Sequence, residues 1–336
     1  MLSDESRGNS RPWQHPSAPN VRCSPSGLST PIPHRLMPRP TLRIVTSTES
    51  GETTPPGARI AAGDPVSIET VRVDAKTVHY TVGGAGPTVL FLHGWGLGHH
   101  AYRSGLRRLA ANGFHVVAPA LPGFGGTPDL EPGNRTFVGY ARWVTRFTKA
   151  TGITPTLIAG HSFGGGVAIR VLADNPGFAQ GLMLLNSVGG VWRHDDGVDR
   201  PMIDRPIWDW GKAIPSDVVG LLGAAGSVLP SVLEDLLPNV LRNPFGVAKV
   251  GRLARSADLV AELATVAQRG VPISLVHSES DAVIPFASFG SLCATAGVEG
   301  KRVKGIHSWP LTNPALFAEL VAAAVLALRQ RSVAIA

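Results

Sequence analysis

The sequence predicts an α/β protein whose eight strands form a mostly parallel sheet with helices on both faces. Strands that are buried on both faces of a parallel sheet consist almost wholly of apolar residues. Four short segments have this composition, at residues 88–92, 115–118, 156–159 and 181–185. Segments with helical character separate them, and this alternation is typical of a sheet built from right-handed strand–helix–strand units.

The remaining elements of the predicted sheet lie before and after these four strands. Residues 68–73 and 77–82 alternate between apolar and polar side chains, and the short Asp74-Ala75-Lys76 link between them predicts a hairpin. Two further candidate strands span residues 272–277 and 301–303. The predicted helices span residues 101–111, 137–150, 163–173 and 257–268, and a last helix runs from Pro314 to about residue 329 with Asn313 as its N-cap.

Two parts of the chain depart from this alternation. Residues 1–65 are rich in Pro, Ser, Arg and Thr without a sustained period, so we expect a disordered tail before a folded domain at residues 66–336. The sequence leaves open whether the true start is Met1 or Met37. Residues 187–255 lack a strand pattern and are cut by many prolines, which predicts an inserted helical cap. The alternative is a set of extra core helices with no part in substrate binding.

Composition and charge narrow the possible partners. The 336 residues carry a formal net charge of +7, but the arginines are scattered and no aromatic residues interleave with basic clusters, so we expect no nucleic-acid binding. The absence of a run of about 18 apolar residues predicts no integral membrane segment. No signal-peptide pattern is found, so a cytoplasmic location is expected. Cys23 and Cys293 are interpreted as reduced thiols. The oligomeric state is not indicated.

The strongest catalytic motif is Gly160-His161-Ser162-Phe163-Gly164, which follows an apolar strand and precedes a helix. In this context a G-x-S-x-G motif is typical of a nucleophile elbow, a strained turn that exposes a serine hydroxyl. Glycine flanks the serine because larger side chains would collide with the neighbouring strand and helix. The motif therefore predicts Ser162 as a nucleophile. The competing interpretation is a plain strand-to-helix turn.

A serine nucleophile needs a base, and the base needs an acid that orients it. His307 is the best-placed base because it lies between the last short strand and the final helix, where it could reach across the carboxyl edge of the sheet. Asp281, which follows the candidate strand at residues 272–277, is the preferred acid. Glu279 is its close rival, and Asp195 and Asp196 are more distant ones.

The oxyanion that forms during acyl transfer needs two N–H donors. We expect one from the backbone of Phe163, directly after the nucleophile. We expect the other from Trp95, in the His93-Gly94-Trp95-Gly96 loop after the first buried strand. Gly94, Trp95 and Phe163 are also the residues expected to contact substrate.

The same loop resembles a cofactor or metal site only superficially. Its glycine spacing fails the dinucleotide-binding fingerprint because His99 stands at the last glycine position. His93, His99 and His100 are not joined by an acid or cysteine at ligand spacing, so no metal is predicted. We expect no cofactor.

Five motifs occur in the order that the α/β-hydrolase fold shows, and residues 66 to about 330 resemble this family. They are His93-Gly94, Leu121-Pro122-Gly123-Phe124-Gly125, the segment from Gly160 to Gly164, the Asp281 loop and Gly305-Ile306-His307. The resemblance implies a catalytic triad in the chain order Ser162, Asp281, His307 and a variable cap. Haloalkane dehalogenases and epoxide hydrolases of this fold carry aspartate at the elbow, so Ser162 disfavours both.

These residues predict a serine hydrolase of the carboxylesterase or lipase type, which cleaves a small, mainly apolar carboxylic ester through an acyl-enzyme intermediate. One alternative is hydrolysis of a carbon–carbon bond next to a ketone by the same triad. Another is a catalytically idle binding protein on this fold. The predicted cap carries Trp192, Trp208 and Trp210 with several apolar stretches. An apolar roof over Ser162, and an apolar small-molecule substrate, are therefore expected.

Overall fold

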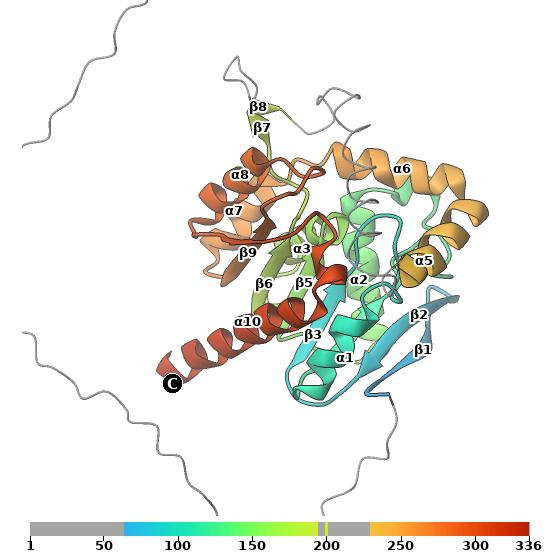
Figure 1. Ribbon diagram of the computed structural model, residues 1–336, viewed down its shortest axis with the longest axis horizontal. Helices are drawn as coiled ribbons and strands as arrows, with labels where there is room; N and C mark the ends of the chain where they lie inside the picture. Colours follow the sequence, from blue (N-terminus) through green and yellow to red (C-terminus); the bar gives the residue numbers. More distant parts are fainter. Residues whose placement is uncertain (1–63, 194–198, 201–228, 336) are drawn as a thin grey trace, which may run out of the picture. The chain divides into compact units, whose positions relative to one another are not determined.

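Eight strands form one sheet in the order β1-β2-β4-β3-β5-β6-β9-β10 in the computed structural model, which describes residues 64–193, 199–200 and 229–335 (Figure 1). Strand β2 pairs with β1 and β4 in antiparallel fashion, and all other neighbours in the sheet are parallel. The strands are β1 (Val66–Val73), β2 (Lys76–Gly83), β3 (Thr88–Leu92), β4 (His115–Pro119), β5 (Leu157–His161), β6 (Gly181–Leu185), β9 (Ile273–Ser278) and β10 (Lys301–Val303). The predicted α/β architecture is confirmed.

Helices occupy most of the connections between these strands. They are α1 (Arg103–Ala111), the 3-10 turn η1 (Pro132–Asn134), α2 (Phe137–Thr151), α3 (Phe163–Asp174), α5 (Leu229–Arg242), α6 (Pro244–Arg255), α7 (Val260–Gln268), α8 (Phe286–Ala296), α9 (Trp309–Thr312) and α10 (Pro314–Ile335). The predicted start of the last helix is confirmed, because Asn313 Oδ1 accepts the Leu316 N–H at 3.0 Å.

The alternation of side chains along each buried strand divides the core into two layers. In β3, Leu90 and Leu92 point into the layer covered by α2, α3, α7 and α8. Val89 and Phe91 point into the opposite layer, which α1 and α10 cover (Figure 1). Both faces of the sheet are therefore buried, which explains the continuous apolar sequence of its central strands.

Two expectations about individual elements need correction. The segment expected to lack strands contains the two-residue strands β7 (Trp192–Arg193) and β8 (Asp199–Arg200), which pair antiparallel. Strands this short leave no alternation in the sequence. The hairpin link is Asp74-Ala75 alone, because Lys76 already pairs with Val73. Both linking residues have positive φ, 51° and 60°, which matches the twist of a two-residue hairpin.

Helix α5 directs two buried polar side chains at the loop after β3. The buried carboxylate of Asp235 accepts the N–H groups of Gly98 and Ala101 through Oδ2, both at 2.9 Å. The buried side chain of Asn239 donates to the carbonyl of Gly96 at 3.0 Å. These bonds attach α5 to the loop after β3, which contains the candidate oxyanion donor.

The predicted tail and the middle of the predicted cap lie outside the described residues, which begin at Asp64 and exclude 201–228 with Trp208 and Trp210. The domain boundary near residue 66 and the role of residues 187–255 as a cap therefore stay predictions. In the ranges that are described, no helix combines the length and hydropathy that a membrane span requires.

Candidate active site

Ser162 lies at the turn between β5 and α3, where the chain leaves the carboxyl edge of the sheet. Its φ of 52° is rarely adopted by a residue other than glycine, so the backbone is strained at this position. Backbone hydrogen bonds hold the turn: among them, the Ser162 N–H donates to the Leu185 carbonyl at 3.0 Å, and the Gly165 N–H donates to the Ser162 carbonyl at 3.0 Å. A nucleophile elbow has this geometry.

The glycines on either side of Ser162 are required because backbone segments approach them closely. A Cβ on Gly160 would lie 2.4 Å from the carbonyl oxygen of Gly164. A Cβ on Gly164 would lie 2.2 Å from the carbonyl oxygen of Leu92. Both distances are far inside van der Waals contact, so a larger residue would push the turn away from β3. These are the collisions that the sequence predicted.

His307 and Asp281 meet beside this turn. The Nδ1 atom of His307 lies 2.9 Å from Oδ2 of Asp281, and the carboxylate is fully buried. Since a carboxylate only accepts hydrogen bonds, Nδ1 carries the proton and the lone pair is at Nε2. The centroid of the His307 ring lies 4.9 Å from that of His161. His307 therefore sits next to the residue that precedes Ser162.

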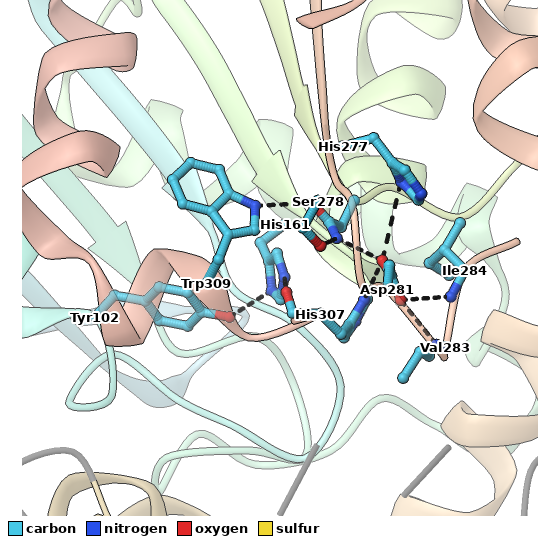
Figure 2. Close-up of polar contacts among 10 residues, drawn as sticks. Tyr102, His161, His277, Ser278, Asp281, Val283, Ile284, His307 and Trp309 are labelled. Atoms are coloured by element: carbon cyan, nitrogen blue, oxygen red, sulfur yellow. Dashed lines mark hydrogen bonds and ion pairs between the residues drawn. The ribbon is translucent and has the colours of Figure 1, made fainter. Parts of the chain in front are cut away.

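The carboxylate of Asp281 accepts four hydrogen bonds (Figure 2). Oδ2 accepts from His307 and from Nδ2 of Asn186. Oδ1 accepts the N–H groups of Val283 at 2.7 Å and Ile284 at 2.8 Å. Burial by itself raises the pKa of this carboxyl, but the charge and hydrogen bond of His307 and the Ile284 N–H outweigh it. The pKa of Asp281 is lowered as a result, and the group stays ionised at neutral pH.

Asn186 is a member of this site that the sequence analysis missed. It follows the last residue of β6, has a φ of 43° and is 1% exposed. Its Oδ1 accepts the indole N–H of Trp309 at 2.8 Å, while its Nδ2 donates to Asp281 and to Oγ of Ser278. The amide cannot rotate without losing these bonds. The signal available in the sequence was an asparagine directly after the apolar strand at residues 181–185.

The loop after β3 also lies close to Ser162. A Cβ placed on Gly94 would lie 3.4 Å from Cβ of Ser162. The Gly94 N–H donates to the hydroxyl of Tyr102 at 3.2 Å, so the next N–H, that of Trp95, is the candidate oxyanion donor of this loop. The N–H of Phe163 is the first in α3, where helical N–H groups have no acceptor within the helix.

The side chain of Trp95 links this loop to α6. Its Nε1–H donates to the carbonyl of Val247 at 2.7 Å, and its ring packs on Gly251. The residue is 39% exposed. The backbone of Trp95 therefore belongs to the loop beside Ser162, while the indole lies against a helix of the predicted cap.

The rival acids differ from Asp281 in their surroundings. Glu279 is exposed on the same loop. Asp195 and Asp196 lie outside the described residues. Asp281 is thus the acid that the structure brings to His307.

His93, in the loop after β3, has structural partners. His93 contacts the Gly94 carbonyl through Nδ1 at 2.8 Å and accepts the Leu121 N–H at Nε2 at 2.8 Å. Burial lowers the pKa of His93 to about 4. In the part of the chain that the structure describes, no group of three or more His, Cys, Asp or Glu side chains is arranged to hold a metal ion.

Comparison with known proteins assigns this fold to a family. A family model described as alpha/beta hydrolase fold matches residues 87–202, which contain β3 and the serine turn. A protein of Mycobacterium phage D29 named "Putative non-heme haloperoxidase" is 30% identical over 268 residues, which are 78% of this chain and 95% of that protein. The chain belongs to the α/β-hydrolase fold family.

Solved structures agree with this assignment at the level of the fold. A bromoperoxidase from Bacillus anthracis superposes with a TM-score of 0.64 at 16% identity, covering 77% of this chain and 99% of that one. The esterase RhEst1 from Rhodococcus sp. ECU1013 superposes with a TM-score of 0.60 at 20% identity, covering 79% and 99%. Enzymes of different specificity share the fold, so the substrate must be inferred from the site.

Proposed function

We propose that this protein is a serine hydrolase that cleaves a small, mainly apolar carboxylic ester through an acyl-enzyme intermediate. The observation that carries the proposal is the 2.9 Å contact between His307 and the buried Asp281, beside the strained turn that presents Ser162. A serine, a histidine and a buried acid in this arrangement form the unit that activates a hydroxyl for attack on a carbonyl.

Each group has a defined task in the proposed reaction. Ser162 Oγ attacks the ester carbonyl carbon while Nε2 of His307 takes its proton, and the N–H groups of Phe163 and Trp95 stabilise the oxyanion. The imidazolium then returns the proton to the leaving alcohol. Water, activated by His307, attacks the acyl-enzyme and releases the acid with Ser162 restored. Asp281 stays ionised throughout and holds the tautomer that leaves Nε2 as the base.

The direct test is labelling by a fluorophosphonate probe, which reacts with activated serines. We expect one modified peptide, which contains Ser162, and loss of ester turnover in proportion to labelling. Heat-denatured protein is the control, because its serines are no longer activated. A folded protein that is not labelled at Ser162 would favour the idle binding protein instead.

The activity is expected to fall as the pH decreases from about 7 to 5. His307 must be neutral to act as a base, and an ordinary histidine titrates near 6.5, so kcat/KM should decrease about tenfold per pH unit below the transition. The pKa of Asp281 lies below its usual value, so Asp281 does not lose its charge in this window. Burial lowers the pKa of His93 to about 4 and of His161 to about 3, so neither of these histidines changes its charge in this window.

Ester turnover measured between pH 5 and 8 checks this expectation. Circular dichroism at each pH, together with recovery of activity on return to pH 8, separates titration from acid unfolding. An activity that stays constant down to pH 5 would contradict a histidine base.

Substrate preference is expected to follow acyl length. Leu236 of α5 lies against Gly96, and Trp95 packs on α6. The described parts of the predicted cap therefore bring apolar side chains to residues 93–96 after β3, which we call the oxyanion loop. Each buried methylene contributes about 0.8 kcal/mol, or about fourfold in kcat/KM. The specificity constant should therefore rise from acetate to hexanoate or octanoate and then level off.

p-Nitrophenyl acetate, butyrate, hexanoate and octanoate measure this series, with an anionic succinate monoester as the charged control. Equal kcat/KM values across the series, or a preference for the anion, would refute the prediction that apolar side chains cover Ser162. Neither result would contradict the proposed catalytic residues. A vinylogous diketone in the same panel tests the alternative, since only carbon–carbon bond hydrolysis would consume it.

A further inference from the structure

A buried chain of hydrogen bonds connects the two loops that meet at Ser162. The Gly94 N–H lies 3.2 Å from the hydroxyl oxygen of Tyr102. That hydroxyl lies 2.7 Å from Nδ1 of His161, and Nε2 of His161 lies 3.0 Å from the backbone carbonyl oxygen of His307 (Figure 2). Tyr102 and His161 are each 1% exposed.

With a neutral His161 ring, one arrangement of protons satisfies these three contacts. The carbonyl of His307 can only accept, so Nε2 of His161 must carry the proton and donate it. Nδ1 of His161 is then an acceptor, and the hydroxyl of Tyr102 must donate to it. The oxygen of Tyr102 is left to accept the N–H of Gly94. Every hydrogen bond therefore has a fixed direction.

The imidazole of His161 is suited to this structural role and unsuited to that of a base. Burial lowers its pKa to about 3, so the ring stays neutral over the pH range in which a histidine base works. His161 is the last residue of β5. Its side chain points to the same face of the sheet as that of Ala159, two residues earlier, and this face is covered by α1 and α10. There it meets Tyr102, which directly precedes α1.

We propose that Tyr102 and His161 are positioning residues that hold the oxyanion loop at Gly94 and the backbone of His307 at a fixed separation across Ser162. This inference rests on the proposed acyl transfer at Ser162. In that reaction the oxyanion donors and the general base must act on one tetrahedral intermediate, and small displacements of either are costly. The pair touches no reacting atom and acts through the peptide groups of Gly94 and His307.

The substitution Tyr102→Phe tests the first half of the chain. It removes one hydroxyl and keeps the buried ring, so kcat should fall about 5- to 10-fold while KM changes less than about twofold. Tyr140→Phe is the matched control, because Tyr140 is also fully buried and its hydroxyl donates to the Pro122 carbonyl at 3.1 Å. Tyr140→Phe should leave kcat within about twofold of the wild type.

Two substitutions at His161 test the second half. His161→Asn retains a polar group near Nδ1 but cannot reach the His307 carbonyl, and kcat should fall about 100-fold. His161→Gln places an amide N–H near the position of Nε2, so its kcat should be at least tenfold higher than that of His161→Asn. Because the two residues act in one chain, the costs of Tyr102→Phe and His161→Asn should combine less than additively. Those of Tyr102→Phe and Tyr140→Phe should add.

A measurement without substrate completes the test. In protein labelled with 15N-histidine, His161 should show a neutral ring with the proton on Nε2 from pH 5 to 8. An imidazolium or a proton on Nδ1 would overturn the proposal, as would a Tyr102→Phe variant with wild-type kcat or an equal loss in Tyr140→Phe. Failure of the proposed function is distinguishable, because then the wild type itself is not labelled at Ser162 by the fluorophosphonate probe and neither proposal survives.

Discussion

Replacing Ser162 with alanine is expected to lower kcat by about 10⁴- to 10⁶-fold, because the nucleophile and its base act as one unit and removal of either disables both. The residue is 8% exposed, and the turn is held through its backbone N–H and carbonyl, which alanine retains. The melting temperature should therefore stay close to that of the wild type. Ester turnover, fluorophosphonate labelling and thermal unfolding measure the three quantities.

Ser187→Ala is the matched control for this experiment. Ser187 is also buried, and its hydroxyl donates to the carbonyl of Val188 at 2.8 Å, close to the serine turn. Its loss should cost stability, at most about 1.5 kcal/mol, and leave kcat within about twofold. If Ser162→Ala retains more than a hundredth of the wild-type kcat, covalent catalysis by Ser162 is refuted.

Replacing Asp281 with asparagine is expected to lower kcat by about 10⁴-fold at neutral pH, as loss of the acid does in other serine triads, but no more than loss of the base itself in His307→Ala. Asparagine has one acceptor oxygen and one donor nitrogen, whereas Asp281 accepts at both oxygens. The amide N–H of the new asparagine would face other donors in either orientation. These are the N–H groups of Val283 and Ile284 in one orientation, and those of His307 and Asn186 in the other. The tautomer of His307 is then no longer imposed.

Glu279→Gln is the control for the acid, since it removes a negative charge two residues away on the same loop. It should leave kcat within about twofold, because Glu279 is exposed. Steady-state kinetics of both variants at pH 8, with circular dichroism to verify folding, decide the assignment. A damaging Glu279→Gln together with a silent Asp281→Asn would show that the acid has been misassigned.

The parts of the fold that depend on local sequence were predictable. Continuous apolar segments mark the strands of a doubly covered sheet, and the N-cap at Asn313 marks the start of α10. Hairpin geometry was less so. Whether Lys76 belongs to the turn or to β2 depends on the positive φ of Asp74 and Ala75. Aspartate tolerates this conformation, but alanine rarely adopts it, so the residue at position 75 does not indicate the turn.

The candidate site was predictable for a related reason. A strained turn between a strand and a helix needs glycine at specific positions, which the sequence shows. The order of the serine, the acid and the histidine along the chain can also be read directly from the sequence. The order by itself could not separate Asp281 from Glu279. The distinction depends on which side chain turns inward after β9, and the structure shows that Asp281 does.

The supporting residues were decided only by tertiary structure. Asn186 contacts Asp281 across 95 residues of chain, Tyr102 contacts His161 across 59, and His161 contacts the backbone of His307 across 146. Each of these bonds depends on the order in which strands are placed side by side and on the face to which a strand's last side chain points. Local sequence constrains neither the distance nor the direction of such polar contacts. The sequence by itself thus determined the fold and the candidate nucleophile and base, whereas packing of remote segments decided which acid meets His307 and what holds these residues in place.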